Sequence, residues 1–199
     1  MLPDNVLLMA RVLILYGTTD GHTRKIATAL REALVDEGVY AFISDARYGT
    51  ETVVAEDYDG VIVAASIHAG GFQRPVTRWV RKQAAELNRM PTAFLAVCLG
   101  ILEKRSETRR TLDEIVRRFQ QSTAWHPNLI KFVAGALPYT RYNWLKRWIM
   151  RRIVAKAGGD TDTTRDFEYT NWTDVRVFAQ AFGRSLERET VRPLSEEFV

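Results

Sequence analysis

The stretch Leu13-Ile14-Leu15-Tyr16-Gly17-Thr18-Thr19-Asp20-Gly21-His22-Thr23 decides the fold of this chain. Its apolar first half is typical of a buried β-strand, and it ends abruptly in small and hydroxyl residues. A helical pattern begins at once, because Ile26, Leu30 and Leu34 fall on one face. We therefore predict a strand, a tight turn and a helix N-terminus in direct succession.

The turn has the composition of an anion-binding loop. The first amides of a helix have no partner inside the helix, and the helix dipole adds partial positive charge. Gly21 lets an anion approach the backbone closely, and hydroxyl donors come from Thr18, Thr19 and Thr23. The patterns GxxxxGK-Ser/Thr and GxGxxG are absent, which argues against nucleoside triphosphates and dinucleotides. The loop favours a single monophosphate, and an ordinary capped turn without a ligand is the alternative.

The composition limits the classes of partner. At 199 residues the chain suits one domain with a sizeable core. Cys98 is the only cysteine, which excludes an intrachain disulfide and a cysteine-rich metal site. The formal net charge is +4, and basic residues crowd into residues 141–156. An anionic membrane surface, an acidic small molecule or a nucleic acid would suit this balance.

Apolar runs and helical patterns alternate along the chain. The further strands are expected at residues 40–44, 60–65, 93–98 and 130–137. The spacing of Thr111 and Glu114 predicts a capping box at the start of one helix, and Asn171 marks the start of the last helix. Five alternations predict a doubly wound parallel sheet, with ligands bound outside the carboxyl ends of its strands.

A long connection interrupts this alternation after the fifth strand. Such a connection inside a compact domain is unusual and often functional. Its middle part should be a helix that mixes Trp144 and Trp148 with basic residues such as Arg151. That helix could rest on anionic lipid, or it could pack on its own domain with its cations in water. An RNA-binding patch is a third option, which no other feature of the chain supports.

The expected organisation has a core domain with flanking segments. Residues 1–10 form an N-terminal extension, residues 11–187 form the domain with an insertion at 138–171, and residues 188–199 form a polar tail. The extension precedes the first strand directly, so we expect it to be dispensable for folding.

Several segments together resemble a known family. They comprise residues 18–23, 65–67, 89–91, 134–137, 139–144 and 158–163. The phosphate-type loop is similar to that of flavodoxins, Thr/Ser-x-Thr-Gly-x-Thr, with Asp20 in place of a hydroxyl residue. The combination resembles the flavodoxin-like, quinone-linked protoporphyrinogen IX dehydrogenases of bacterial heme synthesis, in which Asp stands at this position. The resemblance covers about residues 11–184 and implies a flavodoxin-like sheet of order 2-1-3-4-5.

The resemblance also implies a cofactor, partners and a location. FMN would be the redox cofactor, protoporphyrinogen IX the substrate, and menaquinone or ubiquinone the electron acceptor. The protein would sit peripherally on the cytoplasmic face of the bacterial inner membrane. A general quinone reductase or electron carrier on this fold is one alternative. A non-catalytic adaptor that has lost the flavin is another, and the oligomeric state is left open.

The resemblance distributes roles over named residues. The FMN phosphate would be held by Thr18, Thr19, Asp20, Gly21, His22 and Thr23. The flavin ring would be flanked by Ser66, Ile67, His68, Cys98, Leu99 and Gly100. The substrate propionates and the membrane would meet Arg141, Tyr142, Trp144, Arg147, Trp148, Arg151 and Arg152. His68 is the candidate for proton transfer, although a loop histidine more commonly makes one hydrogen bond. No spacing of metal ligands stands out.

Overall fold

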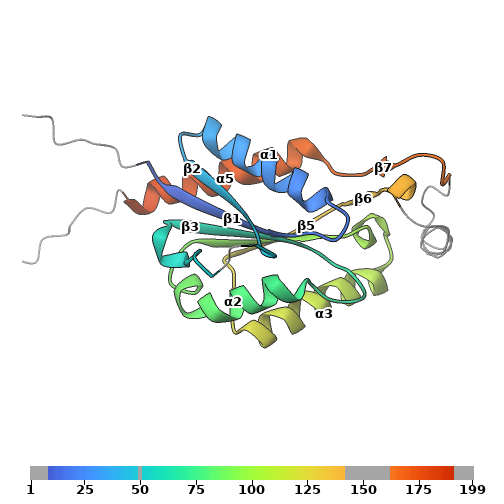
Figure 1. Cartoon of the computed structure of the whole chain (residues 1–199), viewed down its shortest axis with the longest axis horizontal. Coiled ribbons are helices and arrows are strands. Elements are labelled where there is room, and N and C mark those ends of the chain that lie inside the picture. The colour runs from blue at the N-terminus through green and yellow to red at the C-terminus, as the bar shows by residue number, and fades with distance from the viewer. Residues whose placement is uncertain (1–8, 49–50, 142–161, 191–199) are drawn as a thin grey trace, which may run out of the picture.

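A five-stranded parallel sheet forms the centre of the computed structural model, which describes residues 9–48, 51–141 and 162–190. Its strands follow the order β2-β1-β3-β4-β5 (Figure 1). They are β1 (Arg11–Gly17), β2 (Tyr40–Asp45), β3 (Gly60–Ser66), β4 (Thr92–Val97) and β5 (Leu129–Val133). The predicted doubly wound sheet and its strand order are confirmed.

Helices cover both faces of this sheet (Figure 1). One face carries α1 (His22–Asp36) and α5 (Trp172–Thr190), and the other carries α2 (Arg74–Leu87) and α3 (Ser106–Thr123). Side chains of β1 alternate between the two resulting cores, so that Ile14 belongs to the same core as Leu30, and Leu15 to the same core as Val80. Burial on both faces explains why β1 reads as a continuous apolar run rather than as an alternating pattern.

Three short 3₁₀ helices lie in the connections, namely η1 (Ala55–Asp57), η2 (Gly100–Leu102) and η3 (Tyr139–Arg141). None of the helices in the described ranges has the length and apolar character needed to cross a bilayer. Residues 1–8 and 142–161 lie outside the described part, so the proposed extension and most of the basic segment stay predictions, as do the domain boundaries.

The predicted strand 130–137 is wrong in its second half. β5 ends at Val133, and β6 (Ala136–Leu137) pairs antiparallel with β7 (Phe167–Glu168), apart from the main sheet. The backbone N–H of Tyr169 also donates to the Gly135 oxygen, at 3.1 Å, and so extends this small ribbon. An apolar run carries no sign of such a break, because both halves are suited to strands.

The predicted capping box is also wrong. Helix α3 starts at Ser106, which places Thr111 inside the helix, and the Thr111 hydroxyl donates to the backbone oxygen of Glu107 at 3.0 Å. A hydroxyl can make this bond to the preceding turn inside a helix as readily as it caps one. The start of the last helix is confirmed, since Asn171 Oδ1 accepts the backbone N–H of Asp174 at 3.1 Å.

Gly17 closes β1 at a point where no side chain fits. A Cβ added there would lie 2.4 Å from Val76 Cγ2 and 2.8 Å from Gln73 Oε1. We predict that Gly17→Ala lowers the free energy of unfolding of the flavin-free protein by about 1–3 kcal/mol, because the buried Val76 must shift. Urea unfolding measures this loss.

The matched control is Gly71→Ala, because a Cβ at Gly71 meets nothing within 4 Å. Adding Val76→Ala to Gly17→Ala should cost less than the sum of the two single changes. Equal losses for Gly17→Ala and Gly71→Ala would contradict the close approach.

Candidate functional site

The loops that follow β1, β3 and β4 meet at one edge of the sheet. The register sets Gly17 beside Ala65 and Ser66 beside Val97, so the three strands end at nearly the same level. The backbone N–H of Ile67 donates to the Val97 oxygen at 2.8 Å, which ties the second loop to the end of β4. This is the edge at which ligands of doubly wound sheets bind.

The loop between β1 and α1 presents an open helix N-terminus. Gly21 occupies the N-cap position in the left-handed conformation, with φ 90°, and its N–H donates to Thr18 Oγ1 at 2.9 Å. The first turn of α1 contains no acidic residue. Thr18 and Thr23 are buried, whereas Thr19 is exposed. The backbone therefore offers amides and hydroxyls to an anion without a carboxylate inside the first turn.

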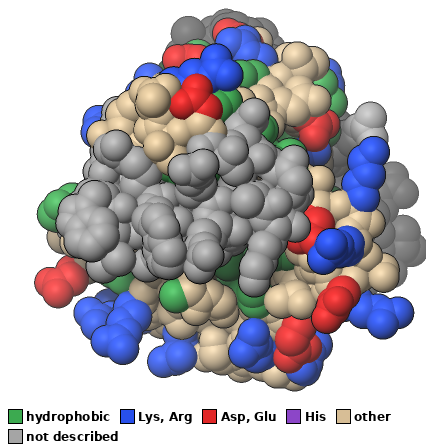
Figure 2. Space-filling view, turned by 90° about the vertical axis from the view of Figure 1, so that its right-hand side faces the viewer, with side chains coloured by type: hydrophobic (Ala, Val, Ile, Leu, Met, Phe, Trp, Pro, Cys, Tyr) green, Lys and Arg blue, Asp and Glu red, His purple; other side chains and the backbone are tan. Residues whose placement is uncertain are grey.

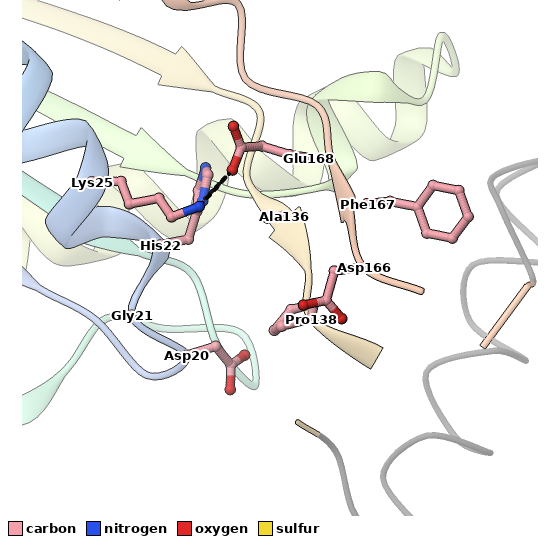
Figure 3. Close-up of a pocket in the computed structure, with 9 residues that line it drawn as sticks. All are labelled: Asp20, Gly21, His22, Lys25, Ala136, Pro138, Asp166, Phe167 and Glu168. Carbon is pink, nitrogen blue, oxygen red and sulfur yellow. Dashed lines mark hydrogen bonds and ion pairs between the residues drawn. The ribbon is translucent and has the colours of Figure 1, made fainter. Parts of the chain in front are cut away.

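Asp20 does not occupy the capping position that a carboxylate could have taken there. Gly21, which has no side chain, is the N-cap, and Asp20 precedes it on the loop. Asp20 is half-buried and lines a shallow hollow together with residues of α1 and of the β6–β7 ribbon (Figure 3).

The side chain of Gln73 joins the first two loops, a contact that sequence reasoning missed. Its Nε2 donates to Ser66 Oγ at 2.7 Å and to Thr19 Oγ1 at 3.2 Å. Gln73 stands at the N-cap of α2, in a segment with few distinctive residues. The only signal was its position at the start of a helix that follows a small-residue loop.

The second loop turns tightly at its tip. His68 and Gly71 exchange backbone hydrogen bonds of 2.8 and 3.1 Å, and Ala69 and Gly70 between them have φ values of 49° and 76°. Both are left-handed values, which glycine adopts without strain. The His68 side chain is exposed.

A polar cluster that the sequence did not reveal links α1 to β7. His22 Nε2 lies 2.6 Å from the Thr170 hydroxyl, which in turn donates to the Ala134 oxygen at 2.7 Å. Since that hydroxyl has only one hydrogen, His22 must donate through Nε2. The Glu168 carboxylate lies 3.6 Å from His22 Nδ1 and 3.0 Å from Lys25 Nζ (Figure 3).

Glu168 is held further by the neighbouring helix. Trp172 Nε1 donates to its Oε1 at 2.9 Å, and the Trp172 ring lies 5.8 Å from the His22 ring. The bonds from Lys25 and Trp172 hold the pKa of the Glu168 carboxyl below its usual value, although burial opposes them. No sequence pattern pointed to this cluster because β7 itself was not predicted.

Comparison with known proteins places this geometry in a family. The flavodoxin domain matches residues 13–164. The chain belongs to the flavodoxin domain family.

This chain also matches two named relatives over most of its length. It is 34% identical to protoporphyrinogen IX dehydrogenase (quinone) of Escherichia coli K12 over 182 residues, 92% of this chain and 99% of that protein. It is 38% identical to the protein of the same name from Leishmania major over 173 residues, 86% of this chain and 74% of that protein.

Solved structures share the fold at low sequence identity. Oxidised flavodoxin 1 of Bacillus cereus is 11% identical, with a TM-score of 0.50, and covers 90% of this chain and 98% of its own. Rubredoxin oxygen:oxidoreductase of Desulfovibrio gigas is 14% identical, with a TM-score of 0.55, over 91% of this chain and 37% of that one.

The residues of the flavodoxin loop fit a phosphate group. Helix α1 has Gly21 at its N-cap and therefore no capping side chain at that position, and hydroxyls stand at Thr18 and Thr23. These features suit the phosphate end of a flavin nucleotide, and flavin binding follows from the family.

Cys98, at the start of the loop after β4, acts as a buried apolar side chain rather than as a reactive thiol. Burial raises the pKa of the Cys98 thiol, although the N–H groups of Ile101 and Gly100 oppose the shift. A protonated, buried thiol acts as a small apolar side chain. Leu99 and Gly100 are half-buried beside it.

The substrate and membrane residues assigned from the sequence fall almost wholly outside the described ranges. Arg141 ends η3, but its side chain is not described. The same holds for Tyr142, Trp144, Arg147, Trp148, Arg151 and Arg152. The structure brings together the loops at residues 18–23, 66–68 and 98–100. The roles assigned to the substrate and membrane residues stay predictions.

His22 generates a pH dependence of stability. Its side chain is 10% exposed, and burial lowers its pKa below the ordinary 6.5, outweighing the opposite effect of Glu168. The folded state therefore prefers neutral His22, whereas the unfolded chain takes up a proton below pH 6.5. We predict that the unfolding free energy falls as the pH drops from 7.5 to 5.5, and that His22→Gln reduces this slope. Urea unfolding across the range measures it.

His126→Gln is the matched control, since His126 is exposed and far from this cluster in the sequence. It should leave the slope unchanged. A slope equal in the wild type and in His22→Gln would show that His22 does not titrate as described.

Proposed function

We propose that this chain is an FMN-dependent protoporphyrinogen IX dehydrogenase that passes electrons to a membrane quinone. The observation that carries the proposal is the open α1 N-terminus at Gly21, in a chain similar over 99% of the length of the Escherichia coli enzyme. Flavodoxin folds serve many functions, so the proposed reaction is supported by the relatives and the proposed cofactor by the loop and the family.

The bound cofactor supplies the redox chemistry, because a flavin accepts hydride equivalents and returns electrons to a quinone. The chain holds and orients it. The amides after Gly21 and the hydroxyls of Thr18 and Thr23 bind the phosphate, with Thr19, Asp20 and His22 completing the loop.

The ends of β3 and β4 provide the walls for the flavin ring. Ser66, Ile67 and His68 approach from one loop, and Cys98, Leu99 and Gly100 approach from the other. Ile67 and Leu99 are half-buried apolar residues that would keep water from the ring. His68 is exposed, so it can exchange protons with solvent, and it remains the candidate for a proton-transfer role.

The basic segment after η3 is proposed to face the substrate and the membrane. Porphyrinogen propionates are carboxylates, for which arginine is the preferred partner. The described side chains on the face that Figure 2 shows include basic and acidic groups mixed together. Attraction to anionic lipid is therefore assigned to residues 141–156, and the protein to the cytoplasmic face of the inner membrane. Menaquinone and ubiquinone are both suitable acceptors.

Complementation tests the reaction. Expression of this chain should restore heme synthesis in a bacterial strain that cannot oxidise protoporphyrinogen, and the purified protein should show an oxidised flavin spectrum. A flavin spectrum without complementation would favour the alternative function, a general quinone reductase or electron carrier. Absence of both would leave a non-catalytic adaptor and overturn the proposal.

Charge reversal tests the basic segment. We predict that Arg141, Arg147, Arg151 and Arg152 changed together to Glu abolish sedimentation with anionic vesicles and lower turnover, because each basic residue near such a surface contributes about 1 kcal/mol. FMN affinity should stay unchanged.

The control reverses an equal number of exposed charges on the helices, at Arg31, Arg78, Lys82 and Arg110. This control should sediment with anionic vesicles more strongly than the variant of the basic segment. Unchanged vesicle binding and turnover in the segment variant would remove the segment from both roles.

A further inference from the structure

We propose that Gln73 is a positioning residue for the bound flavin nucleotide. Its amide donates to the Thr19 and Ser66 hydroxyls and so leaves both hydroxyls to donate hydrogen bonds to acceptor oxygens of the nucleotide. The proposal rests on flavin binding by this chain.

The amide nitrogen of Gln73 contacts two hydroxyl groups. Gln73 Nε2 lies 2.7 Å from Ser66 Oγ and 3.2 Å from Thr19 Oγ1, and an amide nitrogen has two hydrogens to donate. Ser66 ends β3, and Thr19 belongs to the loop after β1. The bridge therefore spans the two subsites of the proposed cofactor, at its phosphate and at its ring.

The direction of these bonds follows from the other end of the amide. Gln73 Oε1 is buried and has no hydrogen-bond partner among the described residues. If the amide were turned over, the buried group without a partner would be an N–H, which proteins tolerate less well than an under-satisfied carbonyl. The nitrogen consequently faces the hydroxyls and donates to both of them.

This direction fixes what the hydroxyls can do. A hydroxyl that accepts from Nε2 keeps its own hydrogen, and the two hydrogens are then free to point at a ligand. Both hydroxyls lie at the carboxyl edge of the sheet, where the nucleotide binds. The matching ligand atoms are acceptors, such as phosphate, ribityl or carbonyl oxygens.

The backbone holds Gln73 in place before any ligand arrives. Its carbonyl accepts the N–H of Thr77 at 3.1 Å and the Thr77 hydroxyl at 3.3 Å, which fixes it at the start of α2. Gly17 makes room for the amide, because a Cβ there would lie 2.8 Å from Oε1. A rigid amide with two fixed acceptors costs little reorganisation on binding.

Two substitutions at Gln73 distinguish a role that depends on the direction of its hydrogen bonds from a role that only holds the two loops together. Gln73→Glu keeps the shape and both contacts but reverses them, since a carboxylate accepts and so draws both hydroxyl hydrogens away from the ligand. Gln73→Met keeps the length and removes the bonds. We expect the FMN dissociation constant to rise about tenfold or more for Gln73→Glu and about threefold for Gln73→Met. Quenching of flavin fluorescence measures it. A bridge that served only to hold the loops would give the opposite order.

A double-mutant cycle removes the effect of the added charge. In a Thr19→Val/Ser66→Ala background the hydroxyls are gone, so Gln73→Glu should raise the dissociation constant by less than about twofold. If the tenfold loss persists in that background, carboxylate repulsion explains it and the proposal is overturned. Urea unfolding of each flavin-free variant shows whether the loops still fold.

The wild type separates this proposal from the assignment of the cofactor. If the wild type takes up no FMN, the proposed function fails. If the wild type binds FMN and the cycle is additive, only the role of Gln73 fails.

Discussion

The burial of β1 on both faces is the constraint on which the rest of the structure depends. Its residues supply both cores at once, with Ile14 in the one and Leu15 in the other. A strand held in this way ends at a fixed place, and Gly17 ends it where α2 leaves no room for a side chain. The chain then has only a short turn before Gly21 opens α1. The position of the helix N-terminus is therefore set by the packing of the whole sheet, and so is the position of any anion bound there.

The loops around this point are connected by polar bonds rather than by apolar contact. Gln73 joins the first loop to the end of β3, and His22 and Lys25 join α1 to the β6–β7 ribbon through Thr170 and Glu168. This ribbon carries the ends of the basic segment, since β6 precedes it and β7 follows it. His22 and Lys25, in the first turn of α1, therefore tie the phosphate loop to this ribbon (Figure 3).

Periodicity and loop chemistry predicted the parts of the fold that depend on local sequence. The five main strands, the turn at Gly21 and the start of α5 at Asn171 follow from apolar runs, a glycine and a capping side chain. The break between β5 and β6 did not follow, because an apolar run is equally consistent with one strand or two. β7 is too short to show a pattern, and Gln73 becomes meaningful only when Thr19 and Ser66 are brought together. Contacts between residues distant in the sequence were therefore the ones that escaped prediction.

The phosphorus resonance of bound FMN tests the central claim most directly. A phosphate monoester in water changes its charge and its ³¹P shift around pH 6, whereas one held by helix amides and hydroxyls away from solvent keeps its charge over a wider range. The account predicts a single bound resonance whose shift is constant between about pH 5 and pH 8. A resonance that titrates like that of free FMN would show that the loop at Gly21 does not hold the phosphate.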